Sequence, residues 1–370
     1  MTGPPGKLST GGALSYMPQL DGLRAVAITL VTVEHWLHQS LLNRALPTGF
    51  MGVRLFFVLS GFLITGILLK SNEPPTSAGP PLARFYARRF LRIFPIYYLT
   101  LAVCYVADLG AVRETLPWHL TYTSNVFYFL KQGLIGLESH FWTLAVEEQF
   151  YLVWPCLIVF TPRRHLRRVM VAVLVVGVLT RPLLLALGYT YILTFPLTCF
   201  DSFAIGGLLA LAAENGRESL AGALAARHRL WGLNGLALVA LFLFPIPFDR
   251  THWVYVSLLS LHWSIFFAWL VGWASLGFEG LGGRVLANPV ALYLGRISYG
   301  FYIFHPFVGV GVESLLPGAV DGPLGSVSLG YLAKYGATVA VASLSWHAIE
   351  APINSLKNAF RYRTATVNVQ

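Results

Sequence analysis

Two residues that could do chemistry, Arg24 and His35, fall on one face of the same helix. They are eleven positions apart, which on an α-helix is three turns plus about 20°, or roughly 16 Å along the axis. An imidazole titrates near neutral pH and suits a general base, whereas a guanidinium binds anions. With the neighbouring Glu34, the pair indicates a functional site. The alternative is a boundary anchor at Arg24 and an interhelical hydrogen bond at His35.

Two adjacent carboxylates, Glu147 and Glu148, stand in the apolar stretch FWTLAVEEQFY at 141–151. A charged side chain inside a membrane costs about 2.5–3.5 kcal/mol, so it is expected where function needs it. The two side chains would point about 100° apart, so at most one faces a given partner, and Glu147 shares a face with Tyr151. The alternative is exposure at the membrane interface.

Two arginines three positions apart, Arg89 and Arg92, precede another apolar run and would be neighbours on a helix. Their forked donors suit phosphate groups. Juxtamembrane arginines also anchor lipid headgroups, and the sequence leaves both interpretations open.

Two further polar positions occur in apolar surroundings. Ser60 and Gly61 form a small pair of the kind that favours close helix packing in membranes. His305 precedes Pro306, where it would line a cavity or satisfy backbone groups that the proline frees. No metal-binding HExxH motif, Gly-rich nucleotide loop or GxSxG elbow occurs, and the three cysteines lack paired spacing. We therefore expect no metal and no permanently bound cofactor.

The composition places these residues in a membrane protein. The chain is 56% hydrophobic and 11% charged, with a mean hydropathy of +0.63. Soluble domains carry about 25% charged residues, so the composition fits a soluble protein poorly. A net charge of +10 would suggest nucleic acid in a soluble protein. Here the basic residues cluster between apolar runs, which the positive-inside rule explains, and no nucleic-acid partner is expected.

The sequence predicts an all-α polytopic membrane protein with about ten transmembrane helices and no soluble domain. A span needs roughly 20 mainly apolar residues. The qualifying runs are 22–42, 50–69, 91–110, 141–160, 168–188, 196–213, 230–247, 253–276, 289–311 and 326–349. The aromatic, half-polar region 117–137 is expected to be interfacial or re-entrant.

The basic residues also predict the orientation and the domain boundaries. The connections after the second, fourth, sixth, eighth and tenth runs hold most of the lysines and arginines. This alternation places both termini in the cytoplasm of a multi-pass protein of the cell (plasma or inner) membrane. Residues 1–19 are expected to be a disordered cytoplasmic tail, 20–352 the transmembrane domain and 353–370 a cytoplasmic tail.

Together these pieces resemble acyltransferase family 3, the membrane acyltransferases that modify sugars, glycans and some antibiotics. The match is carried by Leu20–His35, Gly52–Thr65, Arg88–Tyr98 and His140–Pro155, with Ile297–Pro306 as a weaker fifth stretch. The stretches occur in the family's order, and the likeness extends from about residue 18 to 352. The Arg-x10-His spacing and FWTLAVEEQFY are its specific parts.

The resemblance implies roles for individual residues. Arg24 and His35 match the family's Arg-x10-His pair, and Arg89 and Arg92 match its cytoplasmic Arg-x-x-Arg. Ser60 and Glu147 match further family positions. We expect His35 to act as the catalytic base, with Glu147 orienting its imidazole or stabilising the imidazolium. The arginines Arg24, Arg89 and Arg92 would hold the phosphates of coenzyme A, and Glu34, Ser60, Tyr151 and His305 are further candidates.

The resemblance also implies an activity. We expect transfer of an acyl group, with acetyl as the first candidate, from acyl-CoA to a hydroxyl of a carbohydrate or glycan. This acceptor is expected outside the cytoplasm, in the cell envelope. Acyl-CoA is then a donor substrate, the lipid bilayer is a partner, and the oligomeric state stays open. The alternatives are acylation of a small molecule such as a macrolide and, from a different class, a secondary transporter.

Overall fold

The computed structural model describes residues 16–37, 46–70, 79–243, 253–316 and 324–360. Within these ranges the protein is all-helical and contains no strand, as the sequence predicts. This follows from the long apolar runs, because only a helix satisfies every backbone hydrogen bond within one segment.

Each of the ten apolar runs overlaps one helix of the structure. The helices are α1 (Pro18–Trp36), α3 (Thr48–Lys70), α4 (Gly79–Ala107), α7 (Trp142–Phe160), α8 (Arg163–Ala186), α9 (Phe200–Ala213), α11 (His228–Leu243), α12 (Trp253–Leu276), α14 (Pro289–Leu315) and α15 (Leu324–Ser345). Short helices join them, namely α5 (Val112–Leu120), α6 (Ser124–Lys131), α10 (Arg217–Ala226) and α13 (Gly280–Leu286), and α16 (Ala351–Ser355) follows the last. The region 117–137 thus contributes the end of α5 and all of α6.

Six stretches of the described chain are long and apolar enough to cross a membrane. They are Thr48–Lys70, Leu82–Ala107, Leu137–Phe160, Arg163–Ala186, Pro196–Ala213 and Ser257–Leu276. The other four predicted spans correspond to α1, α11, α14 and α15, so the count of about ten stays a prediction. Helix α1 is not among the six because three of its 19 residues are charged, namely Asp21, Arg24 and Glu34.

The predicted tails lie mostly outside the described residues. Helix α1 begins at Pro18, two residues before the predicted boundary, and residues 1–15 are not described. At the other end, α16 and the 3-10 helix Leu356–Phe360 extend the helical region beyond residue 352. Residues 361–370 are again outside the described part.

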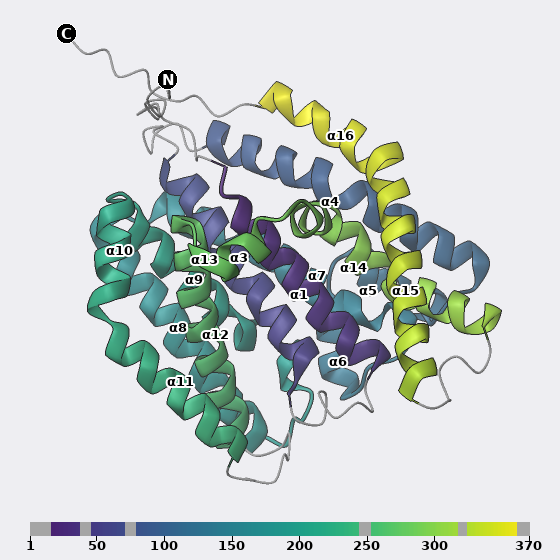
Figure 1. Cartoon of the computed structure of the whole chain (residues 1–370), viewed down its shortest axis with the longest axis horizontal. Helices are drawn as coiled ribbons and strands as arrows, with labels where there is room; N and C mark the ends of the chain where they lie inside the picture. The colour runs from purple at the N-terminus through teal and green to yellow at the C-terminus, as the bar shows by residue number, and fades with distance from the viewer. Residues whose placement is uncertain (1–15, 38–45, 71–78, 244–252, 317–323, 361–370) are drawn as a thin grey trace.

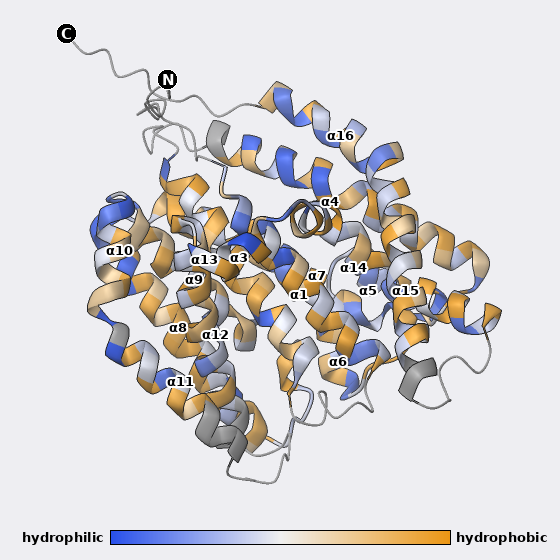
Figure 2. Ribbon diagram, in the orientation of Figure 1, coloured by the Kyte–Doolittle hydropathy of each residue, from blue (hydrophilic) through white to orange (hydrophobic). Residues whose placement is uncertain are grey.

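Helices α1 and α3 form the centre of the bundle (Figure 1). Helix α3 packs against α9 on one side and against α1 on the other, and α1 packs in turn against α14. The outer faces of α4, α8, α11 and α15 expose large apolar side chains, among them Val106, Leu179, Leu236 and Leu344. Figure 2 shows the predominance of apolar residues along these helices. Such faces fit a lipid environment.

The basic connections lie together on one side of the bundle. Arg163, at the start of α8, pairs with Glu214 and donates to the carbonyl of Leu69 at the end of α3. Arg217 donates to the carbonyl of Leu276 at the end of α12. Arg88 of α4 donates to the carbonyl of Lys357. The connections that the sequence assigns to one membrane face are therefore joined to one another.

One close helix contact lies where small residues were expected to pack. A Cβ atom on Gly61 of α3 would overlap the backbone carbonyl of Phe203 in α9. Gly206 of α9 faces the backbone of Val58 in the same way. This confirms the packing role predicted for Gly61 and explains how α3 and α9 approach so closely.

Gly61→Ala should therefore destabilise the protein by about 1–3 kcal/mol, because the added methyl group overpacks a backbone contact. Gly66→Ala is the matched control on the same helix, since nothing lies within 4 Å of its added Cβ. Thermal unfolding of the two detergent-purified variants measures the difference. Equal unfolding temperatures would contradict the packing role of Gly61.

A buried ion triad joins three helices and was not anticipated from the sequence. Asp201 of α9 pairs with Arg54 of α3 at 2.8 Å and with Arg181 of α8 at 2.6 Å. Arg54 also donates to the hydroxyl of Ser202 at 2.9 Å and to the carbonyl of Thr198 at 3.2 Å. The ion-paired side chains are at most 2% exposed. The triad thus fixes α3, α8 and α9 relative to one another.

Candidate active site

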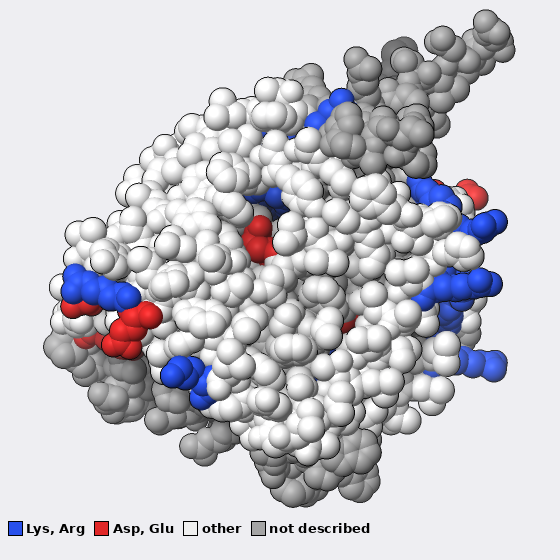
Figure 3. All heavy atoms as spheres, turned by 180° about the vertical axis from the view of Figure 1, so that it is seen from behind, with Lys and Arg blue, Asp and Glu red and all other residues white. Residues whose placement is uncertain are grey.

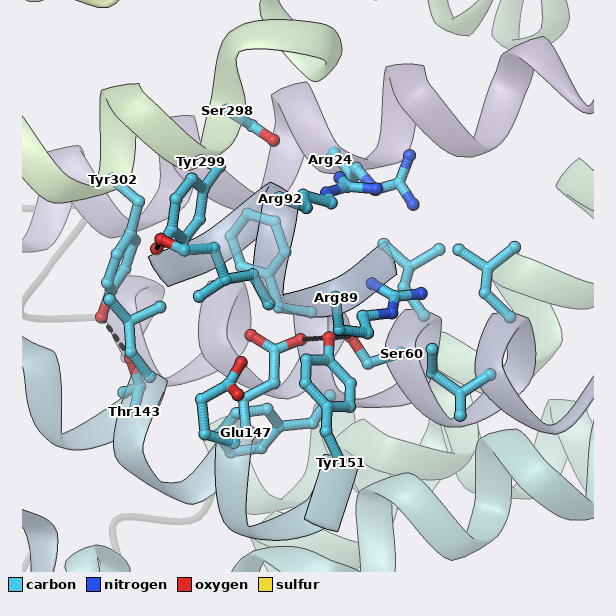
Figure 4. Close-up of a pocket in the computed structure, with 18 of the residues that line it drawn as sticks. Arg24, Ser60, Arg89, Arg92, Thr143, Glu147, Tyr151, Ser298, Tyr299 and Tyr302 are labelled. Carbon is cyan, nitrogen blue, oxygen red and sulfur yellow. Dashed lines mark hydrogen bonds between the residues drawn. The ribbon is translucent and has the colours of Figure 1, made fainter. Parts of the chain in front are cut away.

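A pocket of about 90 Å³ lies between α1, α3, α4, α7 and α14. Its walls are apolar, but charged and hydroxyl-bearing side chains converge on it from all five helices (Figure 4). The polar lining residues are Arg24, Ser60, Arg89, Arg92, Thr143, Glu147, Glu148, Tyr151, Ser298, Tyr299 and Tyr302. On the face opposite to that of Figure 1, Figure 3 shows a hollow holding basic and acidic side chains near the centre, whereas most other charged side chains on this face lie toward its edges.

Glu147 forms the centre of one end of the pocket. Its Oε1 accepts hydrogen bonds from the hydroxyl of Ser60, at 2.5 Å, and from the hydroxyl of Tyr151. The two hydroxyls are 3.2 Å apart. Tyr151 lies four residues after Glu147 on α7, so the shared helical face predicted from the sequence is confirmed. Ser60 comes from α3, a contact that spacing along the chain could not show.

The guanidiniums of Arg24, Arg89 and Arg92 line the same pocket. Arg24 is paired with Asp21 one turn earlier on α1. The Arg89 guanidinium lies 5.0 Å from the centroid of the Tyr151 ring, over its face. Across the described residues, neither Arg89 nor Arg92 donates a hydrogen bond to another residue. Their forked donors are therefore available to a ligand.

His35 lies outside this pocket, in a cluster of three histidines. Its Nδ1 is 2.7 Å from Nε2 of His305, and the two ring planes are inclined by 17° with centroids 4.9 Å apart. The ring of His140 lies 5.0 Å from that of His305. The sequence-based hypothesis that Glu147 orients His35 is not supported, because the carboxylate bonds to Ser60 and Tyr151 and the imidazole to His305.

A hydrogen-bonded pair, Thr143 and Tyr302, stands between the pocket and the histidines. The two hydroxyl oxygens are 2.5 Å apart, and both residues line the pocket. The Tyr302 hydroxyl also donates to the backbone carbonyl of His140 at 2.9 Å, and its ring lies 5.6 Å from that of His305. The pocket and the histidine cluster are thus adjacent parts of one polar region.

The family model of the acyltransferase domain in acyltransferase family 3 matches residues 17–347, which is most of the chain. The chain belongs to acyltransferase family 3. The match gives the chain an acyltransferase domain, which favours an enzyme over the transporter alternative. No solved structure matches the chain.

Curated relatives of this acyltransferase are O-acetyltransferases. The chain is 28% identical over 366 residues to the O-acetyltransferase OatA of Staphylococcus aureus strain NCTC 8325 / PS 47, covering 91% of this chain and 57% of the relative. It is 37% identical over 172 residues to the peptidoglycan O-acetyltransferase OatA of Listeria monocytogenes serovar 1/2a, covering 42% of this chain and 26% of the relative. The chain spans little more than half the length of the Staphylococcus relatives.

The fold of the acyltransferase gathers most of the predicted site residues in the pocket, namely Arg24, Ser60, Arg89, Arg92, Glu147 and Tyr151. Glu34 lies elsewhere: its carboxylate accepts from the backbone N–H of Gly49 at 3.2 Å and the Thr48 hydroxyl at 3.4 Å. It therefore caps the start of α3, where backbone N–H groups lack helix partners. His305 lies with His35.

Several polar groups of the acyltransferase were not singled out as candidates from its sequence. Glu148 lines the pocket together with Glu147, because the pocket extends around that side of α7. Thr143 and Tyr302 also line it, and His140 joins the histidine cluster. Besides the charge of Glu148 in an apolar stretch, the available signal was that these residues fall within two of the five stretches that carry the resemblance. Among the described residues, no group of three or more His, Cys, Asp or Glu could hold a metal ion.

Proposed function

We propose that this acyltransferase moves an acetyl group from acetyl-CoA to a hydroxyl of a cell-envelope glycan presented outside the cytoplasm. The observation that carries the donor assignment is the pair of guanidiniums, Arg89 and Arg92, which line the pocket and donate to no acceptor within the described part of the chain. The acceptor class rests on the relatives, one of which is named a peptidoglycan O-acetyltransferase.

Charge and size both favour coenzyme A as the donor carrier. Three guanidiniums line the pocket, against two carboxylates. Phosphate groups complement such a site through bidentate hydrogen bonds. A cavity of about 90 Å³ is much smaller than the roughly 300–1,000 Å³ that encloses a drug-sized ligand. In this proposal only the slender arm of the donor enters the pocket, and the nucleotide stays near the arginines at its mouth.

His35 is the base in the proposed reaction. The hydroxyl proton of the acceptor moves to the imidazole as the acceptor oxygen bonds to the thioester carbon. The carbon–sulfur bond then breaks, and the thiolate of coenzyme A takes the proton back from the imidazolium. Thr143 and Tyr302 line the pocket, and Tyr302 also contacts His305, so in this proposal their hydrogen bond opens as the thioester arrives.

The test is release of coenzyme A thiol from acetyl-CoA by the detergent-purified protein, with and without peptidoglycan fragments. Thiol release that requires the fragments, together with acetyl ester on the recovered glycan, supports the proposal. Release that requires a macrolide instead would reassign the acceptor to a small molecule. Absence of release with either acceptor, from folded protein, would overturn the proposed donor and acceptor.

Arg89→Ala and Arg92→Ala should each raise the KM for acetyl-CoA about tenfold or more. A hydrogen bond to a charged group contributes about 1.5–3 kcal/mol, and 1.4 kcal/mol corresponds to a factor of ten. Arg168→Ala is the matched control, since Arg168 is exposed and does not line the pocket. An unchanged KM in the Arg89 and Arg92 variants would show that these residues do not hold the phosphates.

A further inference from the structure

Pro306, four residues after Tyr302 in α14, leaves the backbone carbonyl of Tyr302 without its usual helix donor. Proline has no backbone N–H, so Pro306 cannot donate the usual helix hydrogen bond to the carbonyl of Tyr302. Nδ1 of His305 lies 2.7 Å from that carbonyl oxygen. A carbonyl oxygen only accepts hydrogen bonds. The Nδ1 atom of His305 therefore carries a hydrogen.

The other ring nitrogen of His305 is then an acceptor. His305 is fully buried and forms no ion pair in the described part of the chain. A buried imidazolium without a counter-ion is costly, so the ring is neutral and its Nε2 holds a lone pair. Nδ1 of His35 stands 2.7 Å from this Nε2. The hydrogen between the two rings therefore belongs to Nδ1 of His35.

This chain of hydrogen bonds defines the reactive atom of His35. With its hydrogen on Nδ1, a neutral His35 presents a lone pair on Nε2, the nitrogen that does not face His305. His35 as a residue is exposed in the described structure, whereas His305 is buried. We propose that His305 is a positioning residue that holds His35 in the tautomer whose Nε2 accepts the hydroxyl proton. This inference rests on the proposed function, in which His35 is the base.

The hydrogen bond between His35 and His305 also stabilises the imidazolium that His35 becomes during the reaction. When Nε2 of His35 takes the proton, Nδ1 keeps its hydrogen and continues to donate to His305. The hydrogen bond then stabilises the imidazolium until Nε2 returns the proton to the leaving thiolate. No proton moves to His305 at any step, because its Nδ1 hydrogen stays bonded to the carbonyl of Tyr302.

The experiment compares His305→Gln with His305→Phe. The side-chain oxygen of glutamine can accept the hydrogen from Nδ1 of His35, whereas phenylalanine keeps a ring of similar shape without an acceptor. We expect His305→Phe to lower kcat by about a hundredfold or more, within the 10²–10⁴-fold contribution of a general base, with little change in KM for acetyl-CoA. His305→Gln should recover at least about tenfold of that loss. His347→Gln, at an exposed histidine, is the matched control.

A second readout does not depend on activity. Nitrogen-15 NMR of histidine-labelled protein, with the His35 signals identified by their loss in His35→Ala, should show Nδ1 protonated and Nε2 unprotonated in the wild type. The tautomer should change or become mixed in His305→Phe. A protonated Nε2 on neutral His35 in the wild type, or equal kcat losses in folded Gln and Phe variants, would overturn the inference. Absence of wild-type thiol release would instead overturn the proposed function and leave the tautomer result intact.

Discussion

His35→Ala should lower the rate of acyl transfer by about 10²–10⁴-fold, because it removes the proposed general base. The expected loss is mainly in kcat, since His35 lies outside the pocket that holds the arginines proposed to bind the donor. The measurement is acceptor-dependent thiol release from acetyl-CoA at saturating donor.

The control for this prediction is His347→Ala, which removes an exposed histidine remote in sequence from the cluster. It should leave the rate within about twofold of the wild type, because the variant stays folded: surface substitutions usually change the free energy of unfolding by no more than about 0.5 kcal/mol. A folded His35→Ala variant with wild-type kcat would remove His35 from the mechanism and leave Glu147, with its bonded Ser60 and Tyr151, as the candidate base.

Asp201→Ala should cause the largest loss of stability among the predicted variants. It leaves the guanidiniums of Arg54 and Arg181 buried without their shared carboxylate. Removing one partner of a buried ion pair costs about 3–5 kcal/mol, because the remaining charge is uncompensated. The unfolding temperature of the detergent-purified protein should fall by about 5 °C or more.

An exposed ion pair on the same chain provides the control. Asp108 and Arg113 lie 3.0 Å apart, with side chains that are 65% and 49% exposed. Such pairs contribute about 0–1 kcal/mol, so Asp108→Ala should change the unfolding temperature little. Equal effects of the two substitutions would contradict a structural role for the buried triad.

Relations within a single helix could be predicted from the sequence, because they depend only on helical periodicity. Glu147 and Tyr151 share a face of α7 and are bonded to each other, and Arg89 and Arg92 line one pocket. The positions of the ten long helices followed from apolar length in the same way. Helices α1 and α14 nevertheless fall outside the six clearest spans, since the polar residues that they bring to the site lower their apolarity.

The sequence by itself determined an all-helical membrane protein, the family resemblance and six of the eleven polar side chains that line the pocket. Only the tertiary structure decided which of them meet. His35 pairs with His305, 270 positions away, and Arg54 with Asp201, 147 positions away. Periodicity within a helix carries no information about which face of another helix it meets. The partners of Glu147 and His35 therefore depended on how α1, α3, α7 and α14 pack together.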